Sequence, residues 1–348
     1  MMRPMAAQPR EHGRPGSSAL GRNFGRFGLI VAALMALLCF GSLPYTTARV
    51  SSSADADERA LQPRRFELTN AEAARLPPFW VPHAEDELES LRALEESRGA
   101  SVRYWLGTDR LGRDLLSRCL VGGAISLGIG LAAAFMAVCI GTLYGTIAAA
   151  RGGATDAVMM RIVDIIYGLP YILLVVLLTV AVDGLVTRIG SDLTAGARQA
   201  INIVTLMTAI GGVSWLTLAR VTRGQVLSLK HQPFMEACRA IGVGPVRQFR
   251  LHLLPNLLGP ITVYAALTVP SAILSESFLS FLGIGVAEPL PSWGNLAADG
   301  LGELNLVRIR WWLLLWPCLF IALTLVALNF MGEWLRQRID VRRPVADM

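Results

Sequence analysis

Residues 233–260 read PFMEACRAIGVGPVRQFRLHLLPNLLGP and lie between two apolar runs, one ending near Leu218 and the next beginning near Ile261. The stretch itself carries charged and titratable side chains, namely Glu236, Arg239, Arg247, Arg250 and His252. Such groups are costly inside a lipid bilayer. The stretch is therefore expected to be a polar hinge that joins two membrane spans.

Within the hinge, the residue types predict two short helices set at an angle. Residues 236–241 favour a helix, and Gly242 and Gly244 can end it because glycine readily takes positive φ. Pro245 suits the first turn of a second helix. In that helix, apolar and basic side chains recur at helical spacing, which predicts an amphipathic element on the membrane surface. Its apolar positions are Val246, Phe249 and Leu253, and its basic positions are Arg247 and Arg250.

The hinge also resembles a known motif. Glu236-Ala237, Gly242 six residues after the glutamate, and Leu254-Pro255 are similar to the EAA loop of the membrane subunits of bacterial ABC importers, with Cys238 in place of the second alanine. In that family the loop is the coupling helix that docks on a cytoplasmic ATPase. The alternative is an ordinary basic cytoplasmic loop of a polytopic protein. The coupling residues that the resemblance implies are Glu236, Ala237, Arg239, Ala240, Gly242, Leu254 and Pro255.

The composition indicates a polytopic membrane protein. The chain has 348 residues, 53% of them hydrophobic, and a mean hydropathy of +0.48, which is too apolar for an ordinary soluble domain. Lys230 is the only lysine and lies between Leu229 and His231, so the chain contains no P-loop. Any ATP hydrolysis must therefore come from another chain, and the resemblance implies that ATP and magnesium are bound by partner ATPase subunits, with no cofactor in this chain. The five cysteines suggest no disulfide framework, and neither a metal site nor a nucleic-acid partner is expected.

Both ends of the chain are expected in the cytoplasm, with the protein in the bacterial inner membrane. Residues 1–26 carry five arginines against one glutamate, which predicts a cytoplasmic tail. Residues 27–44 are expected to form the first transmembrane helix, although a cleaved signal peptide would also fit. A second basic tail covers residues 336–348.

Residues 45–117 are expected to lie outside the cytoplasm, as an insertion followed by an interfacial segment. The polar part, residues 45–104, contains an acidic, helical-looking stretch at 84–97. It shows no repeat and no catalytic spacing. Two interpretations remain open, a variable insertion and a contact surface for a protein that delivers solute.

Residues 107–118 read GTDRLGRDLLSR and stand at the mouth of the next apolar run. Thr108 or Asp109 can cap a short interfacial helix, and an ion pair between Asp109 and Arg113 is expected. The pattern resembles the signature of the C-type permease subunit of dipeptide, oligopeptide and nickel importers. Its residues are Gly107, Thr108, Asp109, Gly112, Arg113 and Asp114.

Residues 118–335 are predicted to form a core with five further transmembrane helices and a cytoplasmic coupling loop at 220–260. In the third span of the chain, Gly168-Leu169-Pro170 predicts a kink, and Pro170 is a candidate for the translocation pathway. Arg161 and Asp164, three residues apart, are expected to neutralise each other near the interface. The apolar runs of the core are 125–149, 159–182, 201–219, 261–282 and 311–330.

The fifth span contains Ser275-Glu276-Ser277. A charged residue at the centre of a span is unfavourable by about 2.5–3.5 kcal/mol, so Glu276 should face protein or water. Glu276 and Ser277 are therefore candidates for the translocation pathway, and a hydrogen-bonded packing role for Glu276 is equally open. Several tryptophans fit an interfacial aromatic belt, namely Trp293, Trp311, Trp312 and Trp316.

Residues 276–283 and 291–295 also resemble the peptide-importer family, so the resemblance covers roughly residues 105–335. It implies an all-α polytopic protein with six transmembrane helices and the type I (MetI-like) ABC importer permease fold. The function implied is that of a permease subunit in an ATP-driven, binding-protein-dependent importer for di- or oligopeptides. The implied partners are a sister permease in a heterodimer, two cytoplasmic ATP-binding subunits, an extracytoplasmic solute-binding protein and the lipid membrane.

Two other function classes are less well supported by the residues. A secondary transporter, driven by an ion gradient, is the alternative, but the chain shows no internal repeat and few intramembrane ionisable groups. An intramembrane enzyme is disfavoured because the four histidines all lie outside the expected spans. No catalytic residue is expected.

Overall fold

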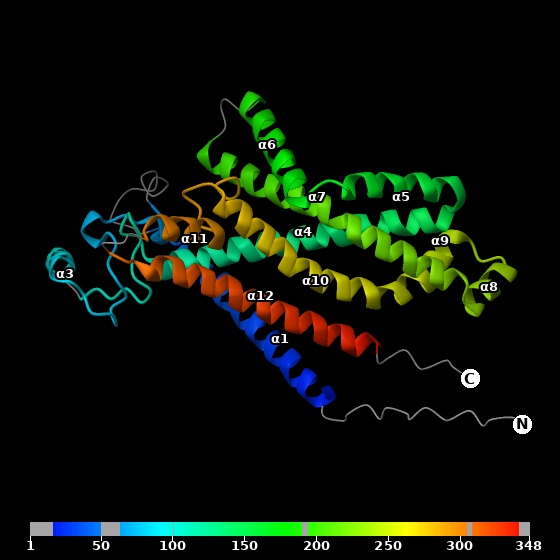
Figure 1. Ribbon diagram of the computed structural model, residues 1–348, viewed down its shortest axis with the longest axis horizontal. Helices are drawn as coiled ribbons and strands as arrows, with labels where there is room; N and C mark the ends of the chain where they lie inside the picture. Colours follow the sequence, from blue (N-terminus) through cyan, green and yellow to red (C-terminus); the bar gives the residue numbers. More distant parts are fainter. Residues whose placement is uncertain (1–16, 50–62, 100, 190–193, 305–307, 341–348) are drawn as a thin grey trace, which may run out of the picture.

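The computed structural model describes residues 17–49, 63–99, 101–189, 194–304 and 308–340 (Figure 1). Every named element in these ranges is a helix, and extended segments pair there only as isolated bridges. The expected all-α class is therefore confirmed. In chain order the elements are α1 (Ser17–Gly41), α2 (Leu43–Thr46), η2 (Arg65–Glu67), η3 (Ala71–Ala73), α3 (Glu85–Arg98), α4 (Leu115–Arg151), α5 (Gly153–Tyr167), α6 (Tyr171–Ile189), α7 (Ala195–Lys230), α8 (Pro233–Ala240), α9 (Pro245–Gln248), η4 (Phe249–Leu253), α10 (Leu254–Phe281), α11 (Trp293–Gly302) and α12 (Trp311–Asp340).

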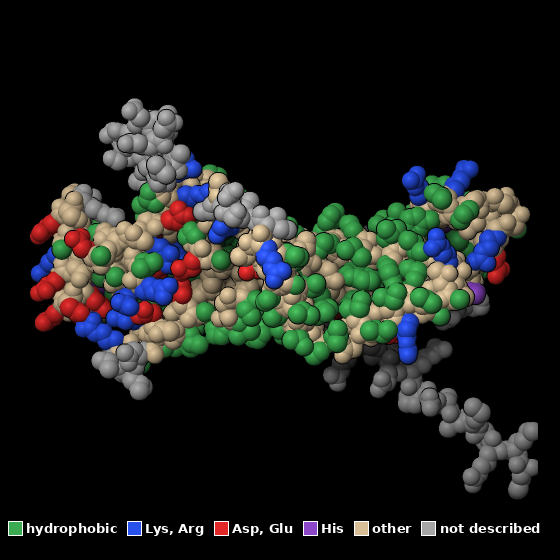
Figure 2. Space-filling view, turned by 90° about the horizontal axis from the view of Figure 1, so that it is seen from above, with side chains coloured by type: hydrophobic (Ala, Val, Ile, Leu, Met, Phe, Trp, Pro, Cys, Tyr) green, Lys and Arg blue, Asp and Glu red, His purple; other side chains and the backbone are tan. Residues whose placement is uncertain are grey.

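Six segments of the described chain are long and apolar enough to cross a membrane, as expected. On the surface, a band of hydrophobic side chains separates two ends where charged side chains gather (Figure 2). α8 and α9 lie at one end, and α3 and α11 lie at the other (Figure 1). The six segments are Phe24–Thr46, Leu115–Arg151, Tyr171–Arg188, Gly196–Lys230, Pro245–Phe281 and Trp311–Ile339.

α4 and α7 pack closely along the middle of the bundle because α4 carries glycines where the two helices cross. A Cβ on Gly141 would lie 2.8 Å from the carbonyl oxygen of Trp215, and one on Gly145 would lie 2.3 Å from that of Ala219. Glycine therefore allows an approach that any side chain would block. Apolar side chains of both helices are buried beside this contact, including Ile129 of α4 and Leu206 and Ile210 of α7.

α1 runs beside α12 on the outside of the bundle (Figure 1). The two helices approach at Gly28, where a Cβ would lie 2.6 Å from the carbonyl oxygen of Ala327. α1 begins at Ser17, so residues 17–26, which were predicted to belong to a tail, are helical. The remainder of the two predicted tails, residues 1–16 and 341–348, lies outside the described residues.

The third predicted span is two helices rather than one kinked helix. α5 ends at Tyr167 and α6 begins at Tyr171. Pro170 explains the break, because proline lacks the N–H that a helix interior needs and disfavours helical backbone at the preceding Leu169. Of the two helices, α6 is the one long and apolar enough to span.

The ion pairs of α5 also differ from the prediction. Asp164 does not pair with Arg161; it accepts a hydrogen bond at 2.8 Å from Arg220 on α7. Asp156 in the first turn of α5 binds both Nε and Nη2 of Arg223, at 2.5 and 2.6 Å. The hydrogen bond from Arg223 lowers the pKa of Asp156. Both contacts fix α5 to α7, which local sequence spacing cannot reveal.

The described part of the predicted insertion is tied to the end of the bundle beside α11. Arg75 and Arg310 both bind the carboxylate of Glu303, at 2.8 and 3.0 Å. Arg308 forms a second link with Asp86 of α3, at 2.5 Å. Residues 50–62 of the insertion lie outside the described residues.

Candidate functional site

The segment between α7 and α10 folds as two short helices joined by a tight turn. α8 ends at Ala240, and Pro245 begins α9, the position expected for it. Gly242 has φ +74°, and next to it the amide of Val243 donates to the carbonyl of Cys238 at 3.0 Å. Gly244 has φ −64°, so of the two glycines only Gly242 uses the left-handed region.

The inner side of this segment is anchored to the ends of α4 and α7. Met235 and Leu253 are buried in a cluster that includes Ala149 of α4. The ammonium of Lys230, at the end of α7, donates to the carbonyl of Ala149 at 2.6 Å. Arg239 of α8 donates in turn to the carbonyl of Lys230 at 2.6 Å. A displacement of α8 would therefore act directly on two membrane-spanning helices.

The outer side of the segment is exposed. Ile241 beside the turn is 78% exposed, and Val246 on α9 is 65% exposed. Val246 was expected on the same apolar face as Phe249 and Leu253, but the π-helical turn η4 shifts the register after α9, and only the latter two pack inward. Among the predicted coupling residues Leu254 is half-buried, and the exposed ones are Glu236, Ala237, Arg239, Ala240, Gly242 and Pro255.

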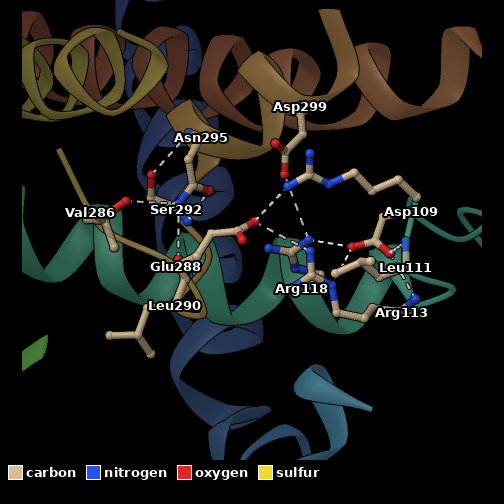
Figure 3. A network of polar contacts seen from close by, with 11 residues as sticks. Asp109, Leu111, Arg113, Arg118, Val286, Glu288, Leu290, Ser292, Asn295 and Asp299 are labelled. Carbon is tan, nitrogen blue, oxygen red and sulfur yellow. Dashed lines mark hydrogen bonds and ion pairs between the residues drawn. The ribbon is translucent and has the colours of Figure 1, made fainter. Parts of the chain in front are cut away.

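At the opposite end of the molecule, the signature segment forms a buried charged cluster around Asp109 (Figure 3). Its carboxylate pairs with Nε of Arg113 at 2.6 Å, as predicted, and with Nη1 of Arg118. The amides of Leu111 and Arg113 each donate to its other oxygen at 2.9 Å. Burial alone would raise the pKa of Asp109, but Arg118 and then the Arg113 amide hold that pKa below its usual range.

The two arginines of this cluster reach two distant segments of the chain. Arg113 lies 3.6 Å from a carboxylate oxygen of Glu288, in the loop after α10. Arg118 lies 3.9 Å from a carboxylate oxygen of Asp299 on α11. Burial raises the pKa of Asp299, while Arg118 opposes that rise. The cluster thus connects the start of α4 with both the loop and the helix that follow α10.

The same loop is held by the start of α11 (Figure 3). The Ser292 hydroxyl accepts from the Asn295 amide at 3.3 Å, and the Asn295 side chain accepts from the Ser292 amide at 2.8 Å. The Asn295 amide group also donates to the carbonyls of Val286 and Leu290, at 3.2 and 3.0 Å. Loop and helix therefore form one unit on the charged cluster.

The other signature residues have local roles that differ from the predicted helix cap. Thr108 does not cap a helix; its hydroxyl accepts from the Leu76 amide at 2.8 Å. Asp114 caps α4 instead, accepting from the Ser117 amide at 3.0 Å. Gly107 and Gly112 have φ of +85° and +73°. Arg118, nine residues from Asp109, was not predicted as a partner because only the fold of this turn brings the two together.

Glu276 lies wholly inside the protein and on no open surface. The hydroxyl of Ser280, one turn on, donates to it at 2.8 Å, and that of neighbouring Ser277 lies at 3.3 Å. Ser126 of α4 and Ser292 also interact with the carboxyl group. Glu276 therefore joins α10, α4 and the start of α11.

Trp293 is fully buried, which corrects its assignment to an interfacial belt. Its indole N–H donates to the carbonyl of Cys119 at 2.9 Å, and its ring stacks on Phe320. Trp312 is also buried. Trp311 and Trp316 are packed beside Trp80 from the predicted insertion, with ring centroids 6.1 and 6.4 Å away.

A groove of about 670 Å³ opens where the break between α5 and α6 meets α7 and α10. No Asp, Glu, Lys or Arg of the described chain is among its lining residues. The hydroxyls of the lining residues Tyr171 and Ser214 are hydrogen-bonded to each other, with their oxygens 3.2 Å apart. Pro170 lies between two lining residues, whereas Glu276 and Ser277 lie behind the groove, next to Ser275. Its hydroxyl-bearing lining residues are Tyr167, Tyr171, Ser214, Thr217, Tyr264, Thr268, Ser271 and Ser275.

Among the described residues, no group of three or more His, Cys, Asp or Glu side chains is placed to hold a metal ion.

Comparison with known proteins identifies a family. The family described as "Binding-protein-dependent transport system inner membrane component" matches residues 141–343. The oligopeptide transport system permease protein OppC of Haemophilus influenzae is 46% identical over 238 residues, which are 68% of this chain and 70% of that protein. The dipeptide transport system permease protein DppC of Bacillus subtilis is 41% identical over 267 residues, or 77% of each chain.

The comparison with solved structures gave a weaker similarity. The MetNI methionine ABC transporter in an inward facing conformation, in its CY5 native crystal form, has a TM-score of 0.47 and 18% identity. The superposition covers 64% of this chain and 96% of that chain.

Proposed function

The chain belongs to the family of binding-protein-dependent transport system inner membrane components, and we propose that it imports short peptides as one permease subunit of an ATP-driven transporter. The family predicted from the sequence is confirmed. The observation that carries the peptide assignment is the identity of 41–46% with dipeptide and oligopeptide permeases over more than two thirds of this chain. The family is one of transport proteins rather than enzymes, and a secondary transporter is not favoured.

The proposed coupling element is the segment from α8 to α9. Its outer side is free for a partner, and its inner side is fixed to α4 and α7 through Arg239 and Lys230. A cytoplasmic ATPase that binds the exposed turn at Gly242 and moves on ATP binding would shift α8. The anchoring contacts would then pass that movement to the spanning helices. ATP and magnesium are bound by the ATPase in this proposal.

The proposed pathway wall is the hydroxyl-lined groove between the α5–α6 break, α7 and α10. Neutral hydroxyls can exchange hydrogen bonds with a peptide backbone and hold no charge that would trap it. Pro170 lies between the lining residues Leu169 and Tyr171, which supports a role for the break between α5 and α6 in shaping the groove. Glu276 and Ser277 support α10 from behind, so their proposed role is positioning.

The proposed assembly contains a sister permease as heterodimer partner, two ATP-binding subunits and an extracytoplasmic solute-binding protein. In it both termini are cytoplasmic, α8 and α9 face the ATPases, and α3 and α11 face the solute-binding protein. The chain divides into an N-terminal tail and helix, an insertion, and a core that carries the pathway and the coupling segment.

Replacing Gly242 tests the coupling role. Gly242→Val should reduce ATP-dependent peptide uptake into proteoliposomes at least tenfold while ATP hydrolysis continues, because a β-branched residue at positive φ is strained by about 1–2 kcal/mol and distorts the turn. Gly244→Val is the matched control: φ of −64° before a proline suits valine, and no atom lies within 4 Å of its Cβ. Equal uptake by the two variants would contradict the proposed coupling.

A further inference from the structure

We propose that the hollow between α6, α7 and the loop after α10 binds the two charged ends of a short zwitterionic peptide. The hollow has a volume of about 420 Å³, within the range of small-ligand sites. It lies toward the ends of α6 and α7 that are far from α8, and is separate from the hydroxyl-lined groove. This proposal rests on peptide import being the function of the chain.

Two opposite charges line this hollow without neutralising each other. Asp183 comes from α6 and Arg198 from α7, and both are exposed. Within the described residues neither side chain has a hydrogen-bond or ion-pair partner. Two side chains of opposite charge that line one hollow without pairing leave two binding points of opposite sign.

A free peptide presents matching groups at its two ends. Its α-amino group, with an ordinary pKa of about 7.7–8.0, is largely protonated at neutral pH, and its α-carboxyl group is ionised. Asp183 can accept hydrogen bonds from the ammonium, and Arg198 can bind the carboxylate through two parallel N–H groups. An extended chain adds about 3.3–3.6 Å per residue, so the length of a peptide sets how far apart its two charged ends can lie.

The walls of the hollow offer polar groups suited to a peptide backbone. The Thr187 hydroxyl donates to the Asp183 carbonyl at 2.8 Å, which leaves its oxygen free to accept from a peptide N–H. The Asn202 side-chain oxygen accepts from the Ala287 amide at 3.3 Å, which leaves its NH₂ free to donate to a peptide carbonyl. Charged termini and backbone N–H and C=O groups are common to all peptides. The site would therefore bind these groups and tolerate different peptide side chains.

Peptide binding to the transport complex without the solute-binding protein tests this site. The complex in lipid nanodiscs is titrated with trialanine, N-acetyl-trialanine and trialanine amide, and binding is followed by saturation-transfer-difference NMR. We expect saturable binding of trialanine and weaker binding of both capped peptides. Asp183→Asn should weaken trialanine binding about tenfold and abolish discrimination against the acetylated peptide, because one charge-assisted hydrogen bond is lost. Arg198→Gln should do the same for the amide.

The matched control is Arg188→Gln, because Arg188 is an exposed arginine of α6 that does not line the hollow. It should bind trialanine like the wild type. Each of three results would overturn the proposed site. They are the absence of saturable trialanine binding, equal binding of free and capped peptides, and binding by the Asp183 and Arg198 variants that equals that of the wild type. Retained ATP-dependent peptide uptake by the wild-type complex would then leave the proposed function standing, whereas a wild type that takes up no peptide would refute that function itself.

Discussion

At the residue scale, Asp109 has the role of a buried counterion. Its carboxylate is shared by Arg113 and Arg118, and the three side chains are at most 5% exposed. Removing one partner from a buried ionic group leaves the others uncompensated. We expect Asp109→Asn to lower the free energy of unfolding by about 3–5 kcal/mol, as measured by thermal unfolding of the purified complex in detergent.

The pH dependence of this effect follows from the lowered pKa of Asp109. A carboxylate with a lowered folded-state pKa stabilises above its unfolded pKa of about 3.9, and loses that contribution as pH falls through the folded value. The difference in unfolding free energy between wild type and Asp109→Asn should therefore stay constant from pH 7 to about 5 and decrease only in stronger acid. Asp86→Asn is the control, since the Asp86–Arg308 pair is solvent-exposed and should not shift the unfolding midpoint. Similar unfolding of both variants would refute the counterion role.

Short sequence distance alone did not decide which ion pairs form. Asp109 and Arg113 are four residues apart, and their pairing was predicted correctly. Arg161 and Asp164 are just as close, but that prediction was wrong because Arg220 of α7 reaches Asp164. Local spacing shows only which pairs are possible, and the packing of helices decides which one forms.

At the scale of elements, hydrophobic length predicted all six spanning helices because that length must match the bilayer. The break between α5 and α6 was predicted only as a kink. Tertiary contacts such as Asp156–Arg223 decide whether the helix continues in the same direction after Pro170, and the sequence does not show them. The coupling turn was predictable from its glycine and proline. The charged hollow at Asp183 and Arg198 was not, because its two sides come from different helices and a loop.

The crossing of α4 and α7 gives a prediction at this scale. Gly145→Ala would place a Cβ 2.3 Å from the carbonyl oxygen of Ala219, so one helix must move. We expect a loss of about 1–3 kcal/mol in stability, measured as a lower unfolding midpoint of the purified complex. Gly128→Ala is the control on the same helix, because no atom lies within 4 Å of its Cβ and alanine favours helix. Equal midpoints for the two variants would show that the crossing does not require glycine.

At the scale of the whole molecule, the two charged ends differ in net charge. The end with α8 and α9 carries a surplus of basic groups that includes Arg239, Arg247 and Arg250. At the other end arginines are balanced by carboxylates, as in the Asp109 cluster and the pairs of Glu303. Cytoplasmic ends of membrane proteins carry the excess of Lys and Arg, so the end with α8 is expected in the cytoplasm.

This orientation can be tested with single cysteines on the two ends. Ile241→Cys at the coupling turn and Leu88→Cys on α3 replace exposed side chains, 78% and 39% accessible respectively. In intact spheroplasts a membrane-impermeant maleimide should label Leu88→Cys only, and Ile241→Cys should react after permeabilisation. The unsubstituted chain gives the background from Cys139 and Cys318, which lie within apolar spans. Labelling of Ile241→Cys in intact spheroplasts would place the turn on the side away from ATP, where no cytoplasmic ATPase could move it.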